Sequence, residues 1–195
     1  MRIRYNAPVT LTFALAAAAL LAIDSLLGTH LILHFFTAPP AGQFNWANPL
    51  SYFRLVSHVF GHASWAHLIG NFSFILLLGP ILEEKYGSLP VLGMMFVTAL
   101  ITGIINVIFF PTGLLGASGI AFMMILLISF TNIKAGEIPM TFILVLAVYL
   151  VQQIVAAVGA SNISEMAHII GGLCGSAFGF LLPEGKTKKA KQITA

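Results

Sequence analysis

Six long apolar runs constrain this chain more than any other feature of its sequence. They lie at about 9–28, 64–82, 89–110, 117–132, 138–158 and 164–182. An apolar helix of about 20 residues is what crosses the hydrocarbon core of a bilayer. The composition agrees: 58% of the 195 residues are hydrophobic and 8% are charged, whereas a water-soluble domain carries about 25% charged residues. The chain is therefore predicted to be all-α and polytopic, with six membrane-spanning helices.

One domain accounts for the whole pattern. Residues 1–183 are predicted to form a single six-helix membrane domain, and 184–195 a basic tail with four lysines. The first apolar run follows Arg2 and Arg4 and has the character of a signal peptide. It is longer than the apolar stretch of about 7–15 residues in such peptides, so it is interpreted as a retained span. The single cysteine, Cys174, rules out a disulfide framework and is expected to be a packing residue.

The placement of basic residues predicts the orientation. Six spans put both termini on one side of the membrane. Eight basic residues fall on that side: Arg2, Arg4, Lys85, Lys134 and the four lysines of the tail. Arg54 falls on the other side, so the positive-inside rule predicts cytoplasmic termini. This explains the net charge of +3 without a nucleic-acid partner, and we expect a prokaryotic plasma (inner) membrane.

The segment between the first two spans, about 29–63, is long for a loop. It is rich in aromatic residues and interrupted by Pro39, Pro40, Gly42 and Pro49, so it is not expected to span. Aromatic segments of this kind favour the membrane–water interface. A long ordered loop often serves a function, so this segment is predicted to lie beside a site on the outer side.

Four polar side chains within the spans are predicted to share one depth. His67 and Asn71 lie one and two turns inside the second span, four residues apart on one helix face. Ser118 stands in the first turn of the fourth span, and His168 about one turn inside the sixth. Since all three spans start on the outer side, these residues meet in the outer third of the membrane. Polar groups at that depth are costly and usually functional.

The chemistry of these four residues is complementary. A serine becomes a nucleophile when a base, most often an imidazole, takes its proton, which predicts Ser118 as nucleophile and His168 as base. Gly116 and Gly119 flank the serine at a helix start, where backbone N–H groups can stabilise an oxyanion. The imidazole and amide of the second span are further donors. Small residues follow His168 on its own face at Gly171, Gly172, Gly175 and Gly179, and predict close packing of the sixth span on the fourth.

Four motifs in chain order resemble the rhomboid family of intramembrane serine proteases over about residues 45–180. The first is R-x3-H-x3-H-x4-H-x3-N, formed by Arg54, His58, His62, His67 and Asn71. The second is the G-x-S-G nucleophile motif at Gly116, Ala117, Ser118 and Gly119. The third is A-H-x-x-G at Ala167, His168 and Gly171, and the fourth runs from Gly79 through Glu83 to Gly87 and Ser88.

The resemblance implies a six-helix bundle that cleaves membrane-protein substrates in or beside their transmembrane helices. It implies a Ser118–His168 dyad with no third acid, and an oxyanion held by the Ser118 N–H, His67 and Asn71. It also implies a gate and cap formed by the fifth span, about 138–158, and the 159–163 loop. No cofactor or metal is implied. Asp24 and Glu165 are the acids at a plausible depth, and Asp24 is expected to hydrogen-bond the following loop instead.

Several residues are expected to support the site rather than react. Arg54 is expected to tie the loop through backbone carbonyls, and Glu83 to brace the cytoplasmic end of the second helix. Phe122 stands where the family commonly has a tyrosine, and its ring can still stack on the base. Pro80 stands where a second glycine is common and is expected to kink or end that helix.

Other interpretations remain open on sequence alone. Ser118 could be a helix cap, His168 an interhelical hydrogen-bonding residue, and His67 with Asn71 a structural polar pair. His58 and His62 invite a metal site, but no H-E-x-x-H is present, so loop hydrogen bonding is favoured. The alternative function is a catalytically inactive rhomboid-like protein that binds membrane helices. Nothing in the sequence indicates an oligomeric state.

Overall fold

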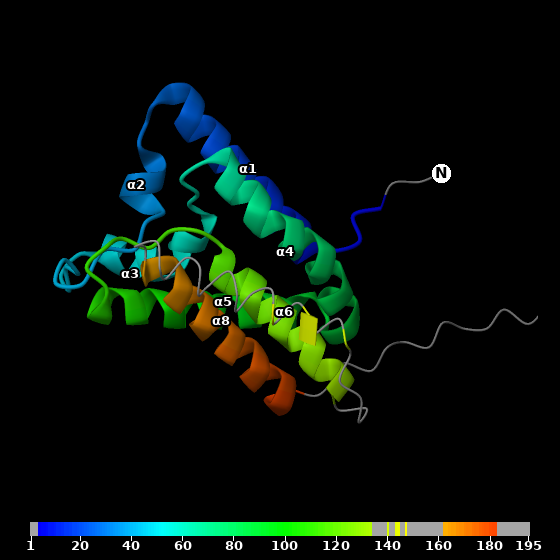
Figure 1. Ribbon diagram of the computed structural model, residues 1–195. Helices are drawn as coiled ribbons and strands as arrows, with labels where there is room; N and C mark the ends of the chain where they lie inside the picture. Colours follow the sequence, from blue (N-terminus) through cyan, green and yellow to red (C-terminus); the bar gives the residue numbers. More distant parts are fainter. Residues whose placement is uncertain (1–3, 134–139, 141–142, 145–146, 148–161, 183–195) are drawn as a thin grey trace, which may run out of the picture.

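The computed structural model describes residues 4–133, 140, 143–144, 147 and 162–182. Its elements are α1 (Pro8–Leu27), α2 (Leu31–Phe35), α3 (Pro49–Ser57), the 3₁₀ turn η1 (His58–Phe60), α4 (Trp65–Tyr86), α5 (Ser88–Phe109), α6 (Ser118–Ile133) and α8 (Asn162–Leu181) (Figure 1). The predicted gate, cap and basic tail lie outside the described residues, apart from four positions of the fifth span. Among the described residues, the one extended pairing is an isolated bridge between Ala38 and Leu114.

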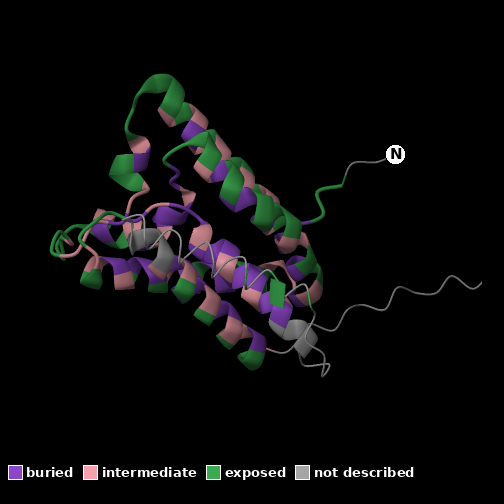
Figure 2. Cartoon of the chain, in the orientation of Figure 1, coloured by how far each residue is buried: buried purple, intermediate pink, exposed green. Residues whose placement is uncertain are grey.

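The prediction of an all-α polytopic membrane protein is confirmed. Helices α1, α4 and α5 have 20, 22 and 22 residues and mean hydropathies of 2.0, 1.6 and 2.3, sufficient to cross a bilayer. Helices α6 and α8 carry shorter apolar stretches. Large apolar side chains face outward, as Leu77 and Leu173 do at 64% and 65% exposure, and exposed positions follow the outer sides of α1 and α4 (Figure 2). Such faces are stable against lipid.

The helices begin and end at residues that suit those positions. Pro8 is the first residue of α1, where its missing N–H costs nothing, and Gly28 ends the helix in the left-handed conformation at φ 60°. The Ser64 hydroxyl caps α4 by accepting from the His67 N–H. Helix α4 runs through Pro80 to Tyr86. Of the two effects expected of Pro80, a kink or an end, the end is therefore wrong, because a proline-interrupted ladder is tolerated where neighbours pack around it.

Glycines bring the helices into backbone contact. A Cβ atom at Gly171 would overlap the carbonyl group of Gly119, and one at Gly175 would overlap that of Met123, so α8 packs directly on α6. Figure 1 shows the two helices running side by side. This is the packing that the glycine face of the sixth span predicts. A Cβ at Gly103 would likewise overlap Leu55, which seats α3 against α5.

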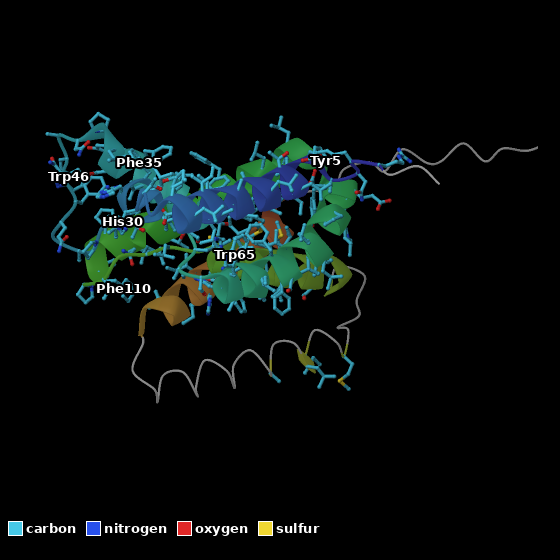
Figure 3. All side chains as sticks on the ribbon, turned by 90° about the horizontal axis from the view of Figure 1, so that it is seen from above. Tyr5, His30, Phe35, Trp46, Trp65 and Phe110 are labelled. Atoms are coloured by element: carbon cyan, nitrogen blue, oxygen red, sulfur yellow. The ribbon has the colours of Figure 1, made fainter. Side chains whose placement is uncertain are left out.

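The segment between α1 and α4 folds over one end of the bundle. Asp24 accepts hydrogen bonds from the Leu31 N–H at 2.5 Å and the Thr29 hydroxyl at 3.1 Å, and Arg54 donates from Nε to the His34 carbonyl at 2.6 Å. Both predictions, Asp24 bonding the following loop and Arg54 tying it to a carbonyl, are confirmed. Figure 3 shows His30 and Trp46 at this end of the molecule and Tyr5 at the opposite end. We refer to them as the loop end and the N-terminal end.

Candidate active site

The chain approaches the predicted nucleophile through a glycine that lies beside α4. Gly116 has φ +116°, which favours glycine, and its N–H donates to the His58 carbonyl at 2.9 Å. A Cβ at Gly116 would lie 2.7 Å from Cε1 and 2.8 Å from Nε2 of His67, and 3.5 Å from Nδ2 of Asn71. The segment before Ser118 therefore lies against the imidazole and the amide that were expected to hold an oxyanion.

Ser118 is the first residue of α6 and is half-buried. The first bond of the helix ladder runs from the Ala121 N–H to the Ala117 carbonyl, so the N–H groups of residues 118–120 are not used by the ladder. They lie at the positive end of the helix dipole, where a negative charge is stabilised. A serine at this position has backbone N–H groups beside it that could stabilise an oxyanion.

Helix α8 carries His168 onto the same face of α6. A Cβ at Gly119 would lie 3.2 Å from the Ala167 carbonyl oxygen, which leaves room for glycine and little more. The rings of Phe122 and His168 have centroids 4.5 Å apart and are tilted by 38°. Because Phe122 stands one turn after Ser118, the two share a helix face, and the His168 imidazole packs on that face.

Two hydrogen bonds that were not predicted from the sequence orient Asn71. They run from Asn71 to His62 and from His62 to the Phe60 carbonyl. Nδ1 of His62 lies 3.2 Å from the Phe60 carbonyl oxygen and therefore carries the proton. Nε2 of His62 is then an acceptor, and it receives the Asn71 amide N–H at 3.1 Å. Burial lowers the pKa of His62 to about 4, so the ring is neutral at physiological pH. The Asn71 amide thus donates one N–H to His62, and its second N–H is available to another acceptor.

His58 is a buried residue of the loop and lies against α5. It is 1% exposed, and its Nε2 lies 3.3 Å from the Thr102 hydroxyl of α5. Burial lowers the pKa of His58 to about 4, against the opposing effect of the Arg54 and Leu55 carbonyls. Within the described part of the chain, no three histidine, cysteine, aspartate or glutamate side chains are arranged to hold a metal ion.

The sequence-predicted residues thus divide into two groups. The structure brings together Gly116, Ser118, Gly119, Phe122, His168, His67 and Asn71. Arg54 ties the loop, as described above. Glu83 lies 12 residues after Asn71 on α4, about 18 Å along the helix, and binds the start of α1.

Fold and site together define a class: a polytopic helical membrane protein with a serine at a helix start beside a histidine of a neighbouring helix. The family model described as Rhomboid domain matches residues 49–185. The chain belongs to the rhomboid family.

Two curated proteins are similar to it. Rhomboid protease GlpG of Haemophilus influenzae is 24% identical over 131 residues, which cover 66% of this chain and 68% of that protein. Rhomboid-like protein 11, chloroplastic, of Arabidopsis thaliana is 22% identical over 173 residues, covering 80% of this chain and 62% of that protein. The match thus spans slightly more than two thirds of the first relative and slightly less than two thirds of the second.

Proposed function

We propose that this protein is an intramembrane serine endopeptidase that cleaves membrane-protein substrates with a Ser118–His168 dyad. The observation that carries the proposal is the backbone contact between α6 and α8. Gly119 follows the serine and Ala167 precedes the histidine, and a Cβ at Gly119 would lie 3.2 Å from the Ala167 carbonyl oxygen. The match to a family whose similar member is named a protease supports the same reading.

In the proposed reaction, the His168 imidazole takes the proton of the Ser118 hydroxyl while Oγ attacks the scissile carbonyl carbon. The resulting oxyanion accepts hydrogen bonds from the Ser118 N–H, the free amide N–H of Asn71 and the His67 imidazole. His168 then gives its proton to the leaving amine, and a water molecule hydrolyses the acyl-enzyme by the same two proton transfers.

His62 acts as a positioning residue in this account. The Asn71 amide can flip its oxygen and nitrogen, and an oxygen aimed at an oxyanion would repel it. Because His62 accepts from Asn71 and is itself held by the Phe60 carbonyl, the amide nitrogen is fixed toward the loop. A Cβ at Gly116 would lie 3.5 Å from that nitrogen, which supports an oxyanion position between Asn71 and the start of α6.

We also propose the topology and the domain organisation expected from the sequence. Residues 1–183 form one membrane domain with both termini in the cytoplasm, and the loop end faces outward. Support comes from the eight basic residues on the predicted cytoplasmic side. We propose a prokaryotic plasma membrane as the location. The similarity to a chloroplast protein makes a plastid membrane the alternative that localisation would test.

The experiment is cleavage of a single-span membrane protein by purified enzyme in liposomes. Ser118→Ala and His168→Ala should each lower turnover by roughly 10⁴-fold or more, as removal of a nucleophile or its base does. Ser176→Ala is a matched control, because the Ser176 hydroxyl donates to the Gly172 carbonyl of its own helix. Cleavage that persists in Ser118→Ala would reject the nucleophile. An intact parent protein that binds membrane helices without cutting any would favour the inactive alternative.

A further inference from the structure

A cavity of about 540 Å³ opens on the side of the bundle formed by α1 and α5. Its volume lies within the range of about 300–1,000 Å³ that small-molecule sites have. The lining is almost entirely apolar and comes from residues 8–16 of α1, residues 92–99 of α5 and Ile120 of α6. Val56 of α3 and Val59 and Phe60 of η1 line its end toward the loop, which we call the closed end. We call this cavity the α1–α5 groove.

The groove is about one leaflet deep. Its α1 wall covers eight residue steps, or about 12 Å of helix, and half of a hydrocarbon core of about 30 Å is about 15 Å. The Phe60 ring lies 4.8 Å from that of Phe13 at the closed end. A transmembrane substrate helix needs about 20 residues to cross, so the groove is too short for one. One acyl chain, entering from the N-terminal end, has the matching length and polarity.

A polar pocket adjoins the open end of the groove. It is lined by Arg4, Tyr5 and Asn6 before α1, and by Pro80, Glu83, Glu84 and Ser88 where α4 meets α5. The Tyr5 hydroxyl, from the polar pocket, is 2.9 Å from the hydroxyl of Thr12, which lines the groove. The two cavities are therefore neighbours, and Tyr5 lies at the end of the molecule away from the loop (Figure 3).

The pocket presents one cation and one exposed carboxylate. Glu83 is not available to a ligand, since its carboxylate accepts hydrogen bonds from the starts of α1 and α5. Arg4 and Glu84 are both exposed and line the same pocket. An arginine binds a phosphate well, and a carboxylate binds an ammonium group. The pair is complementary to a headgroup that carries a phosphate and an ammonium ion.

We propose that the α1–α5 groove and the polar pocket form one binding site for a phospholipid with an ammonium headgroup. One acyl chain fills the groove, the phosphate binds Arg4, and the ammonium binds Glu84. The lipid comes from the leaflet at the N-terminal end, whose headgroups lie at the level of the pocket. This site goes beyond the proposed proteolysis and does not depend on it.

The closed end of the groove links the lipid to the active-site loop. Val59 lies between His58, whose carbonyl accepts from Gly116, and Phe60, whose carbonyl accepts from His62. An acyl chain packed under Val59 and Phe60 supports the turn that carries both carbonyls. The bound lipid should therefore raise the unfolding temperature of the protein, since a ligand that binds the folded state stabilises it.

The test uses phosphatidylethanolamine with a photoreactive diazirine in one acyl chain, and the full-length protein in nanodiscs of phosphatidylglycerol. After irradiation, mass spectrometry should locate adducts within residues 8–16 and 92–99. Ala16→Phe fills the groove and should lower this labelling several-fold. Ala19→Phe is the matched control, because Ala19 is exposed on α1 and does not line the groove. Equal labelling of all apolar helix faces, unchanged in Ala16→Phe, would overturn the site.

A second arm tests the headgroup. Glu84→Gln should weaken labelling by the phosphatidylethanolamine probe about two- to five-fold, the effect of one partly exposed ion pair. It should leave labelling by a phosphatidylglycerol probe unchanged, whereas Arg4→Gln should weaken both. Folding of each variant is checked by its unfolding temperature in detergent. If the two probes label the groove equally in the parent and in Glu84→Gln, the ammonium assignment is wrong.

Discussion

Helix α4 carries a polar cluster at each of its two ends, and the clusters differ in how completely their hydrogen bonds are made. At the N-terminal end of the molecule, where α4 ends, Glu83 joins α1, α4 and α5. At the loop end, His67 and Asn71 face the start of α6. Polar groups among apolar helices cost free energy, so each cluster is expected to contribute to stability or to function.

The Glu83 cluster is saturated. Its carboxylate accepts from the Thr10 N–H and hydroxyl at 2.7 Å each, from the Ser88 hydroxyl at 2.6 Å and from the Val9 N–H at 3.3 Å. It thereby satisfies backbone donors at the start of α1 and holds the starts of α1 and α5 against the C-terminal end of α4. A group with four donors has little capacity left for a substrate.

The loop-end cluster has hydrogen-bond donors that its own contacts do not use. The Asn71 amide gives one N–H to His62, and the ladder of α6 does not use the first N–H groups of that helix. Ser118, His67 and His168 are half-buried, so a substrate can reach them. We infer from this comparison that the Glu83 cluster serves stability, whereas the loop-end cluster, with its second Asn71 N–H, is suited to the proposed chemistry.

The largest effect should separate two asparagines. Asn71→Ala removes the proposed oxyanion donor and should lower the turnover of the protein that remains folded by about 10²–10³-fold. Asn106 is the matched control: it is also buried, and its amide donates to the Pro39 and Thr112 carbonyls at 3.1 Å. Asn106→Ala should lower the unfolding temperature and leave the turnover of folded protein nearly unchanged. Equal effects of the two substitutions on turnover would remove the distinction.

The buried loop histidines should make stability depend on pH. A histidine that ionises at about 6.5 unfolded and at about 4 in the fold, as His58 does, takes up its proton first in the unfolded chain. The free energy of unfolding should therefore fall as pH drops from about 6.5 to about 4, by about 3 kcal/mol for His58 alone. Denaturation in detergent at several pH values measures this slope.

His58→Gln should flatten that slope, and His30→Gln should not, because His30 is exposed. A parent protein whose stability is constant between pH 4 and 6.5 would contradict the burial of a neutral His58. Burial also lowers the pKa of His62 to about 4. The double variant His58→Gln/His62→Gln should therefore show a smaller pH dependence of the free energy of unfolding than His58→Gln alone, and the difference measures the contribution of His62.

Glu83→Ala tests the saturated cluster. It leaves the Val9 and Thr10 N–H groups and two hydroxyls without their acceptor, and should cost about 2–3 kcal/mol of stability, as lost hydrogen bonds to a charged group do. Turnover of the protein that remains folded should change little. Ser73→Ala is the control on the same helix, where the exposed side chain donates to the Ile69 carbonyl of its own helix. Unchanged stability in Glu83→Ala, or a turnover loss as large as that of Asn71→Ala, would break the comparison.

The smallest effect concerns the ring under His168. Phe122→Ala removes the aromatic contact seen at 4.5 Å and should lower turnover by about two- to ten-fold, the equivalent of about 0.5–1.5 kcal/mol. Phe122→Tyr keeps the ring and should retain the parent rate within about three-fold, on the same scale. If Phe122→Ala cleaves as fast as Phe122→Tyr, the stack does not hold the imidazole.

The sequence predicted the helices well because the membrane imposes their length. The first predicted span, 9–28, compares with a helix at Pro8–Leu27, and the third, 89–110, with one at Ser88–Phe109. The shared depth of the polar residues followed from counting along such helices. The second apolar span was predicted to end at 82, and the helix continues to Tyr86, because its last turn is held by Glu83 contacts that hydropathy does not register.

The loop contacts could not be read from the sequence. The bond from Asn71 to His62, and the place of the Gly116 N–H on the His58 carbonyl, depend on how the irregular chain between α3 and α4 folds back. Irregular segments lack the periodicity from which depth and face are inferred. The spacing of His58, His62 and His67 showed that the histidines belong together, but not which partner each would bind.

The most direct test of the proposed dyad is covalent labelling with a fluorophosphonate probe, followed by mass spectrometry of the adduct. The probe reacts with a serine whose hydroxyl is activated by a base. The parent protein should carry the adduct on Ser118, His168→Ala should lose it, and Asn106→Ala should keep it. Labelling of a different serine, or undiminished labelling of Ser118 in His168→Ala, would contradict the proposal that this hydroxyl and this imidazole act together.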